Sequence, residues 1–184
     1  PRVRNELVHV NSAGEVLRTL GDPDAWVSMA ISPDATRLAL ERLDEDGKSA
    51  DVWTMDLGTQ AVSRFTTFSG PWRWFGTPVW SHDGTRLLVT NFTGPYWLKP
   101  VRRPDDAGER LPHKLDGVGG WPTDWSADEK FVVAVQNDPV TSQDIWVLPT
   151  APGGQPVAYA KTAFSEHGGR LSPDGRWLAW TSNE

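Results

Sequence analysis

A turn pattern recurs four times in this chain of 184 residues, and it constrains the fold more than any other feature. Each copy has a serine two residues before an aspartate, and the four aspartates are Asp34, Asp83, Asp128 and Asp174. They are spaced 49, 45 and 46 residues apart. An apolar stretch precedes each turn and another follows it, so each turn is predicted to join two antiparallel strands.

A second marker falls between the turns. It is a short strand centred on Trp53, Trp97 or Trp146, and the segment "LVHVNSAG" fits the same place with His9 at the tryptophan position. Two interleaved markers with a period near 45 residues are typical of β-propeller blades, which have four short strands each. Strand a leads into the Ser-x-Asp turn, strand b follows it, strand c carries the tryptophan and strand d is outermost. We therefore predict an all-β propeller of four-stranded antiparallel blades, with the tryptophans packed between blades.

The register of the repeat places both ends of the chain in the middle of a blade. Residues 1–184 are predicted to be a single propeller domain or part of one, with four blades' worth of strands. Residues 5–20 would supply strands c and d of one blade, and residues 167–182 would supply strands a and b of another. The complete blades are predicted at 24–68, 73–115 and 118–163.

The two half blades add up to one composite blade, whose pairing would satisfy exposed strand edges. Three assemblies fit this arithmetic: a four-bladed ring from one chain, an eight-bladed ring from a homodimer, or a stretch of a longer propeller. Self-association or the remainder of a longer propeller is therefore the expected partner.

Composition excludes several other classes of partner and site. The net charge is −6 and no basic stripe occurs, which argues against nucleic acid. No apolar run approaches the roughly 18 residues of a membrane span, so membrane insertion is not expected. The absence of cysteine excludes disulfides and thiolate metal sites. The sequence also lacks the G-x-S-x-G, H-E-x-x-H and phosphate-loop motifs.

Two stretches, "ISPDATRLALERLDEDGKSADVWTMDL" and "LSPDGRWLAWTSNE", resemble the TolB-like, WD40-type propeller repeat. That repeat reads roughly W-S-P-D-G, then an apolar strand, then D-I-W-V. The resemblance covers nearly the whole chain and is especially close to propeller domains of bacterial serine/threonine kinases. Similar repeats occur in propellers that gate prolyl-oligopeptidase-type peptidases. The resemblance implies the fold and favours a location outside the cytoplasm, but propellers host many functions.

One face of the predicted propeller gathers the d–a and b–c loops, which are aromatic and acidic. The residues expected to bind a ligand at the channel mouth are Trp26, Trp74, Phe75, Trp121 and Arg170. Aromatic walls with a few charged groups suit a small ligand or a protein partner. The first functional expectation is therefore a non-catalytic recognition or scaffold module.

Carboxylates and an imidazole at the same mouth suggest an alternative. His167, Glu166, Asp124 and Asp24 are candidate ligands of a divalent cation, either Ca²⁺ for the carboxylates or Zn²⁺ or Mn²⁺ where histidine takes part. Such an ion polarises a carbonyl or phosphoryl oxygen and activates water. The alternative, by analogy with propeller hydrolases, is a metal-dependent esterase, lactonase or phosphotriesterase with His167, Glu166 and Asp124 as catalytic candidates.

Overall fold

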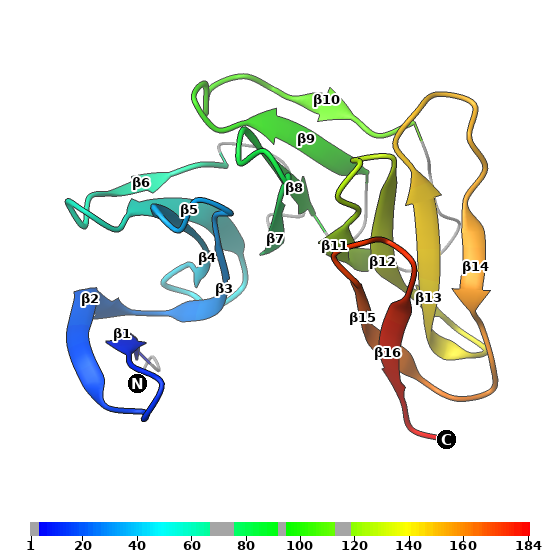
Figure 1. Cartoon of the computed structure of the whole chain (residues 1–184), viewed down its shortest axis with the longest axis horizontal. Coiled ribbons are helices and arrows are strands. Elements are labelled where there is room, and N and C mark those ends of the chain that lie inside the picture. Colours follow the sequence, from blue (N-terminus) through cyan, green and yellow to red (C-terminus); the bar gives the residue numbers. More distant parts are fainter. Residues whose placement is uncertain (1–3, 67–75, 92–94, 113–118) are drawn as a thin grey trace.

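The computed structural model describes residues 4–66, 76–91, 95–112 and 119–184, and these consist of strands joined by turns and loops (Figure 1). The first hairpin contains β1 (Asn5–Val10) and β2 (Val16–Asp24), and the last contains β15 (Glu166–Leu171) and β16 (Leu178–Ser182). Three four-stranded antiparallel sheets lie between them in the sequence. The first contains β3 (Trp26–Ile31), β4 (Arg37–Leu43), β5 (Ala50–Asp56) and β6 (Val62–Arg64). The second contains β7 (Gly76–Trp80), β8 (Arg86–Thr90), β9 (Tyr96–Pro100) and β10 (Glu109–Arg110). The third contains β11 (Gly120–Trp125), β12 (Phe131–Asp138), β13 (Ser142–Pro149) and β14 (Val157–Ala160).

The predicted fold class is confirmed, because each sheet runs in chain order from strand a to strand d. The innermost strands pack in succession, β3 on β7, β7 on β11 and β11 on β15. The sheets follow one another along an open arc, with the two ends of the chain on opposite sides of the view (Figure 1). Because β1–β2 and β15–β16 remain separate two-stranded sheets, this chain alone does not form the four-bladed ring. No helix in the described residues is long and apolar enough to cross a membrane.

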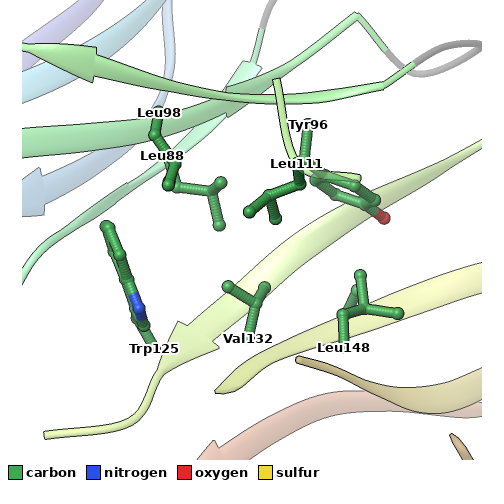
Figure 2. Close-up of a cluster of buried hydrophobic side chains, with 8 residues drawn as sticks. Leu88, Tyr96, Leu98, Leu111, Trp125, Val132 and Leu148 are labelled. Atoms are coloured by element: carbon green, nitrogen blue, oxygen red, sulfur yellow. The ribbon is translucent and has the colours of Figure 1, made fainter. Parts of the chain in front are cut away.

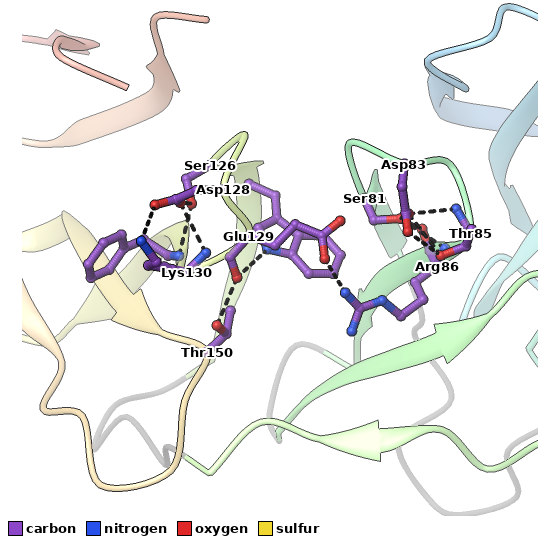
Figure 3. A network of polar contacts seen from close by, with 11 residues as sticks. Ser81, Asp83, Thr85, Arg86, Ser126, Asp128, Glu129, Lys130 and Thr150 are labelled. Atoms are coloured by element: carbon purple, nitrogen blue, oxygen red, sulfur yellow. Dashed lines mark hydrogen bonds and ion pairs between the residues drawn. The ribbon is translucent and has the colours of Figure 1, made fainter. Parts of the chain in front are cut away.

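The Ser-x-Asp turns form because each aspartate organises the residues around it (Figure 3). The Ser81 hydroxyl donates to Asp83 Oδ1 at 2.6 Å and accepts from the backbone N–H of Arg86 at 2.9 Å. Asp83 Oδ1 also accepts from the backbone N–H of Thr85 at 2.9 Å. The same hydroxyl-to-carboxylate bond occurs in the other three turns. The spacing of serine and aspartate therefore encodes the a–b hairpin through hydrogen bonds that close within five residues.

Two turns reach this geometry without the usual glycine. Gly84 and Gly175 have φ of 68°, and Ala35 and Glu129 take the same left-handed conformation with φ of 53° and 58°. Glu129 has a second use, because its carboxylate forms an ion pair with Arg86 of the preceding blade (Figure 3). Glutamate at this position therefore keeps the turn conformation, and its side chain connects the turn to the preceding blade.

The first hairpin is the outer half of a blade, but its register differs by one residue from the prediction. Trp53 lies three residues before Asp56, whose carboxylate accepts backbone N–H groups of the following turn. Val8 lies three residues before Asn11, whose side-chain oxygen does the same. Val8 therefore occupies the tryptophan position, and the assignment of His9 to it is wrong. A one-residue shift of this strand leaves the period of the repeat almost unchanged, so the period alone does not separate Val8 from His9.

Apolar side chains of neighbouring blades form the core. Figure 2 shows one cluster between the second and third sheets, whose labelled members are Leu88, Tyr96, Leu98, Leu111, Trp125, Val132 and Leu148. Each strand-c tryptophan packs against such a cluster on the side of the preceding blade: Trp53, Trp97 and Trp146. The tryptophan marker of the repeat therefore encodes packing between blades, as predicted.

Removing one turn hydroxyl tests its contribution to stability. We expect Ser81→Ala to lower the free energy of unfolding by about 1–3 kcal/mol, because it leaves a buried N–H without its acceptor. Ser172→Ala removes the same bonds in the more exposed last turn, so its effect should be smaller. Urea unfolding followed by circular dichroism measures both, and equal losses would contradict the role of burial.

Acid should destabilise the fold through the same turns. Hydrogen bonds from the turn serines hold the pKa values of Asp34, Asp83, Asp128 and Asp174 below their usual range. A lowered pKa in the folded state contributes stability above the unfolded value of about 3.9 and loses it as pH falls through the folded value. The urea concentration at the unfolding midpoint should therefore decrease as the pH is lowered below about 4. A variant with asparagine at all four positions should show a shallower fall, and an unchanged slope would contradict the explanation.

Candidate functional site

The inner strands of the arc enclose a groove of about 550 Å³, here called the channel groove. It is lined by residues of β3, β7, β11 and β15, so every blade and the last half blade contribute to it. Its polar lining includes Ser28, Thr77, Thr123, Asp124 and Arg170, with Ser32 and His82 at the end that bears the turns. Its apolar lining includes Met29, Ile31 and Val79. The groove thus combines an apolar wall with hydroxyl groups, a carboxylate and a guanidinium.

Asp124 and Arg170, which the repeat register aligned, are both in this groove. Asp124 Oδ1 accepts from the backbone N–H of Trp125 at 2.8 Å, and its Oδ2 accepts from that of Leu171 at 2.7 Å. Both carboxylate oxygens therefore accept hydrogen bonds from backbone N–H groups, and the bond from Leu171 connects β15 to the third sheet. The Arg170 side chain is exposed and makes no hydrogen bond or ion pair with another side chain or backbone group in the described part of the chain. Arg170 thus supplies a positive charge that is open to a ligand.

Thr77 is the most unusual residue of the groove. Its φ is 45°, in the left-handed region that β-branched residues avoid, and its hydroxyl is enclosed without a hydrogen bond. Glu41, only 3% exposed, accepts from the Thr77 backbone N–H at 3.1 Å and from the Ser28 hydroxyl at 2.8 Å. A Cβ atom on Gly76 would lie 2.4 Å from this carboxylate, so a larger residue there would displace the Glu41 side chain. Glu41 therefore holds Thr77 in a strained conformation, which is common at functional sites.

Glu166 and His167 do not converge. Glu166 is 1% exposed, its Oε1 accepts a hydrogen bond from the Thr162 hydroxyl, and its Oε2 is buried without a partner. His167 is exposed, and its backbone carbonyl accepts from the Thr181 hydroxyl at 3.0 Å. Both residues lie on β15, where successive side chains point to opposite faces. The His167 imidazole and the Glu166 carboxylate therefore lie on opposite faces of the sheet, because the two residues are adjacent on one strand.

The predicted cation ligands are not assembled into one site. Asp24 forms an ion pair with Arg42 at 2.5 Å and accepts from the backbone N–H of Ala25 at 2.8 Å. Asp124 is engaged with backbone as described above. Among the residues that the structure describes, no group of three histidine, aspartate or glutamate side chains is placed to hold a metal ion. The expectation of a metal-dependent hydrolase therefore gains no support from the arrangement of His167, Glu166, Asp124 and Asp24.

The aromatic residues predicted at the channel mouth have different surroundings. Trp26 is 7% exposed and packs in the core against the first hairpin, which argues for a structural role. Trp121 is partly buried and packs between the third sheet and β15–β16. Trp74 and Phe75 lie outside the described residues. Of the three predicted ligand-binding residues that the structure describes, Arg170 lies in the channel groove and Trp26 and Trp121 do not line it.

Sequence reasoning missed the hydroxyl groups of the groove. Ser28 and Thr77 each lie six residues before a turn aspartate, Asp34 and Asp83. The same position holds Pro122 and Gly168 in the other two repeats, so the repeat gave only a weak signal for these hydroxyl groups. The strain at Thr77 had no sequence signal, since it arises from contact with Glu41 on a different sheet.

Comparison with known proteins identifies the fold. No family model matches the chain, and no curated protein matches it. Among solved structures, TolB from Acinetobacter baumannii is 21% identical with a TM-score of 0.74, and the match covers 95% of this chain and 42% of that one. The putative TolB from Agrobacterium tumefaciens is 17% identical with a TM-score of 0.76, covering 97% of this chain and 63% of that one.

A third similar structure is the β-propeller domain of the Trilobed protease from Pyrococcus furiosus, which has an open velcro topology. It is 18% identical with a TM-score of 0.56, and the match covers 89% of this chain and 52% of that one. The chain thus spans less than two thirds of each of these structures. These similarities confirm the TolB-like propeller fold that the sequence repeat predicted.

Relief of the strain at Thr77 tests its origin. We expect Thr77→Gly to raise the free energy of unfolding by about 1 kcal/mol, because left-handed strain of about 1–3 kcal/mol exceeds the cost of glycine flexibility. Thr123→Gly is the matched control in the same groove. Thr123 has no positive φ and its hydroxyl donates to the Val133 carbonyl at 3.3 Å, so its replacement should destabilise. Losses of stability in both variants, measured by urea unfolding, would refute the strain.

Proposed function

We propose that this chain is a non-catalytic propeller recognition module, and that the channel groove binds a small carboxylate-bearing ligand such as the end of a peptide. The observation that carries the proposal is the exposed Arg170 guanidinium inside a groove built by four inner strands. Its volume of about 550 Å³ falls within the range of small-ligand sites. The TolB-like propeller fold is consistent with a binding or scaffold role.

Charge in the groove favours an anionic group at Arg170. Asp124, the acidic residue of the groove lining, accepts two backbone N–H groups and forms no ion pair with the Arg170 guanidinium within the described residues. Guanidinium and carboxylate form paired hydrogen bonds of matching geometry. A carboxylate at the end of a ligand would therefore accept two hydrogen bonds from Arg170.

The rest of the groove suits the body of such a ligand. Met29 and Ile31 are 65% and 58% exposed and form an apolar wall on β3. Three hydroxyl-bearing residues, Ser28, Thr77 and Thr123, also line the groove. Apolar contact with a few fixed polar groups is the usual composition of a ligand site. The contacts proposed here only bind a ligand and do not react with it, so they support a role in recognition.

The groove is the inner surface of an arc, so the complete module needs more propeller strands. Either a second copy of this chain or the remainder of a longer propeller would supply them. Both possibilities leave the Arg170 site on the same inner strands.

Binding is tested with a mixed pool of tetrapeptides that have free carboxyl ends, using the same pool with amidated ends as the control. We expect ¹⁵N–¹H spectra of the labelled chain to shift at β3, β7, β11 and β15 with the free pool only. Arg170→Ala should weaken binding at least about tenfold, since a charge-assisted bond is worth about 1.5–3 kcal/mol. Arg176→Ala, on an exposed turn outside the groove, should bind as the unchanged chain does.

Three results would overturn this proposal. They are the absence of shifts, shifts confined to residues outside the inner strands, and equal binding of free and amidated pools. An Arg170→Ala chain that binds normally would likewise remove the carboxylate assignment.

A further inference from the structure

The channel groove contains a histidine that the proposed contacts with a ligand do not use. His82 lines the groove at the end that bears the turns, beside Ser32 and Pro33 of the neighbouring turn. Its side chain is exposed and makes no hydrogen bond or ion pair with any group in the described part of the chain. The imidazole is therefore available to a molecule that fills the groove.

His82 differs from the residues at the same position of the other turns. It directly precedes the turn aspartate Asp83, and the corresponding residues are Pro33, Ala127 and Pro173. Those three side chains carry neither a charge nor a hydrogen-bonding group. Of the four Ser-x-Asp turns, only that of the second blade therefore has a titratable side chain at this position.

The carboxylates around His82 are engaged elsewhere. In the turns of the three complete blades, Asp34, Asp83 and Asp128 each accept hydrogen bonds from the turn serine and from a backbone N–H two residues further on. On the inner strands, Asp124 accepts two backbone N–H groups. Within the described residues none of these carboxylates is paired with His82. A negative group that contacts the imidazole would therefore come from a ligand.

His82 and Arg170 lie at different levels of the groove. Arg170 is four residues before the aspartate of its turn, and His82 is one residue before the aspartate of its own. The strand levels match between blades, because the Leu171 N–H next to Arg170 donates to Asp124, which has the same repeat position as Arg170. Three residues of extended chain span about 10 Å. The guanidinium and the imidazole are therefore separated by a length of this order along the channel.

A basic group at each of these levels suits a ligand with two negative groups. The Arg170 guanidinium forms paired hydrogen bonds with a carboxylate. A histidine that is protonated carries a positive charge and donates from both ring nitrogens, and histidines change charge between about pH 5 and 8. Ile31 and Trp80, each three residues before its turn aspartate, line the groove between the two levels. The part of the ligand that joins its two charges would therefore meet mainly apolar side chains.

We propose that the channel groove binds peptide ends that carry two carboxylates about 10 Å apart, the terminal one at Arg170 and a side-chain one at His82, and that acidification strengthens binding by protonating His82. This inference rests on the proposed carboxylate site at Arg170 and adds a second charge to it. Each residue of an extended peptide spans about 3.3–3.6 Å. The second carboxylate thus belongs to an acidic residue two positions before the carboxyl end.

Three acetylated tetrapeptides with free carboxyl ends test the proposal: Ala-Glu-Ala-Ala, Ala-Gln-Ala-Ala and Ala-Ala-Ala-Glu. The first has its second carboxylate at the proposed spacing, and the second replaces it with an amide. The third has the same net charge as the first, but its two carboxylates are too close together to reach both levels. Titration calorimetry at pH 7.5 and 5.5 measures the affinities, since a glutamate side chain stays ionised at both values.

We expect the first peptide to bind at least about threefold more tightly than the other two at pH 5.5, as for an ion pair that remains partly in contact with water. At pH 7.5 this preference should be smaller, because fewer imidazoles are protonated. His82→Ala should abolish the preference, and the turn accepts alanine there because Ala127 has this position in the third blade. His9→Ala, on β1 outside the groove, is the matched control and should keep the preference.

The possible results separate this inference from the function on which it rests. Equal affinities of the three peptides at pH 5.5, or a preference that survives His82→Ala, would overturn the second contact and leave Arg170-dependent binding in place. A preference of the same size at both pH values would overturn the role of protonation. If none of the peptides binds, the carboxylate site at Arg170 and this inference both fail.

Discussion

The structure depends on the burial of apolar sheet faces between successive blades. Each sheet has two apolar faces, and a single four-stranded sheet cannot bury either of them. The cluster of Figure 2 shows how this is solved, because Leu88 and Leu98 of one sheet meet Val132 and Leu148 of the next. Stability therefore comes from contacts between neighbouring blades, and every blade needs a neighbouring blade on each side. The exposed side chains at the two ends of the arc follow directly from this requirement.

The Ser-x-Asp turns add local order to that packing. Each turn closes an a–b hairpin through its own serine and aspartate, so the inner half of a blade is specified by about ten consecutive residues. Contacts such as Arg86 with Glu129 and Trp125 then connect the turns of adjacent blades. Local hydrogen bonds thus determine the hairpin, and the interface determines its place in the arc. The last hairpin, β15–β16, has the complete local network but covers only part of the third sheet.

The fold could be predicted because two sequence markers recur with one period, whereas the site depends on contacts that periodicity does not describe. The aspartate spacing and the strand-c tryptophans were enough to predict four-stranded blades. The same spacing placed His9 where Val8 lies, because a one-residue shift is invisible until the cap at Asn11 is recognised. Trp26 was expected at the channel mouth and lies in the core, since a bulge in β3 alters which face its side chains take. Arg170 was found because its register position is shared with Asp124.

Glu41 connects the fold to the candidate site. Its buried carboxylate would be costly without hydrogen-bond donors, and it obtains them from the Ser28 hydroxyl and the Thr77 backbone. The first two sheets are joined by this contact, and a side chain at position 76 larger than glycine would displace the Glu41 carboxylate. Thr77 adopts a left-handed conformation at this contact, and its hydroxyl is buried without a hydrogen-bond partner. A contact between two blades thus extends to the inner surface, where Ser28 and Thr77 line the channel groove.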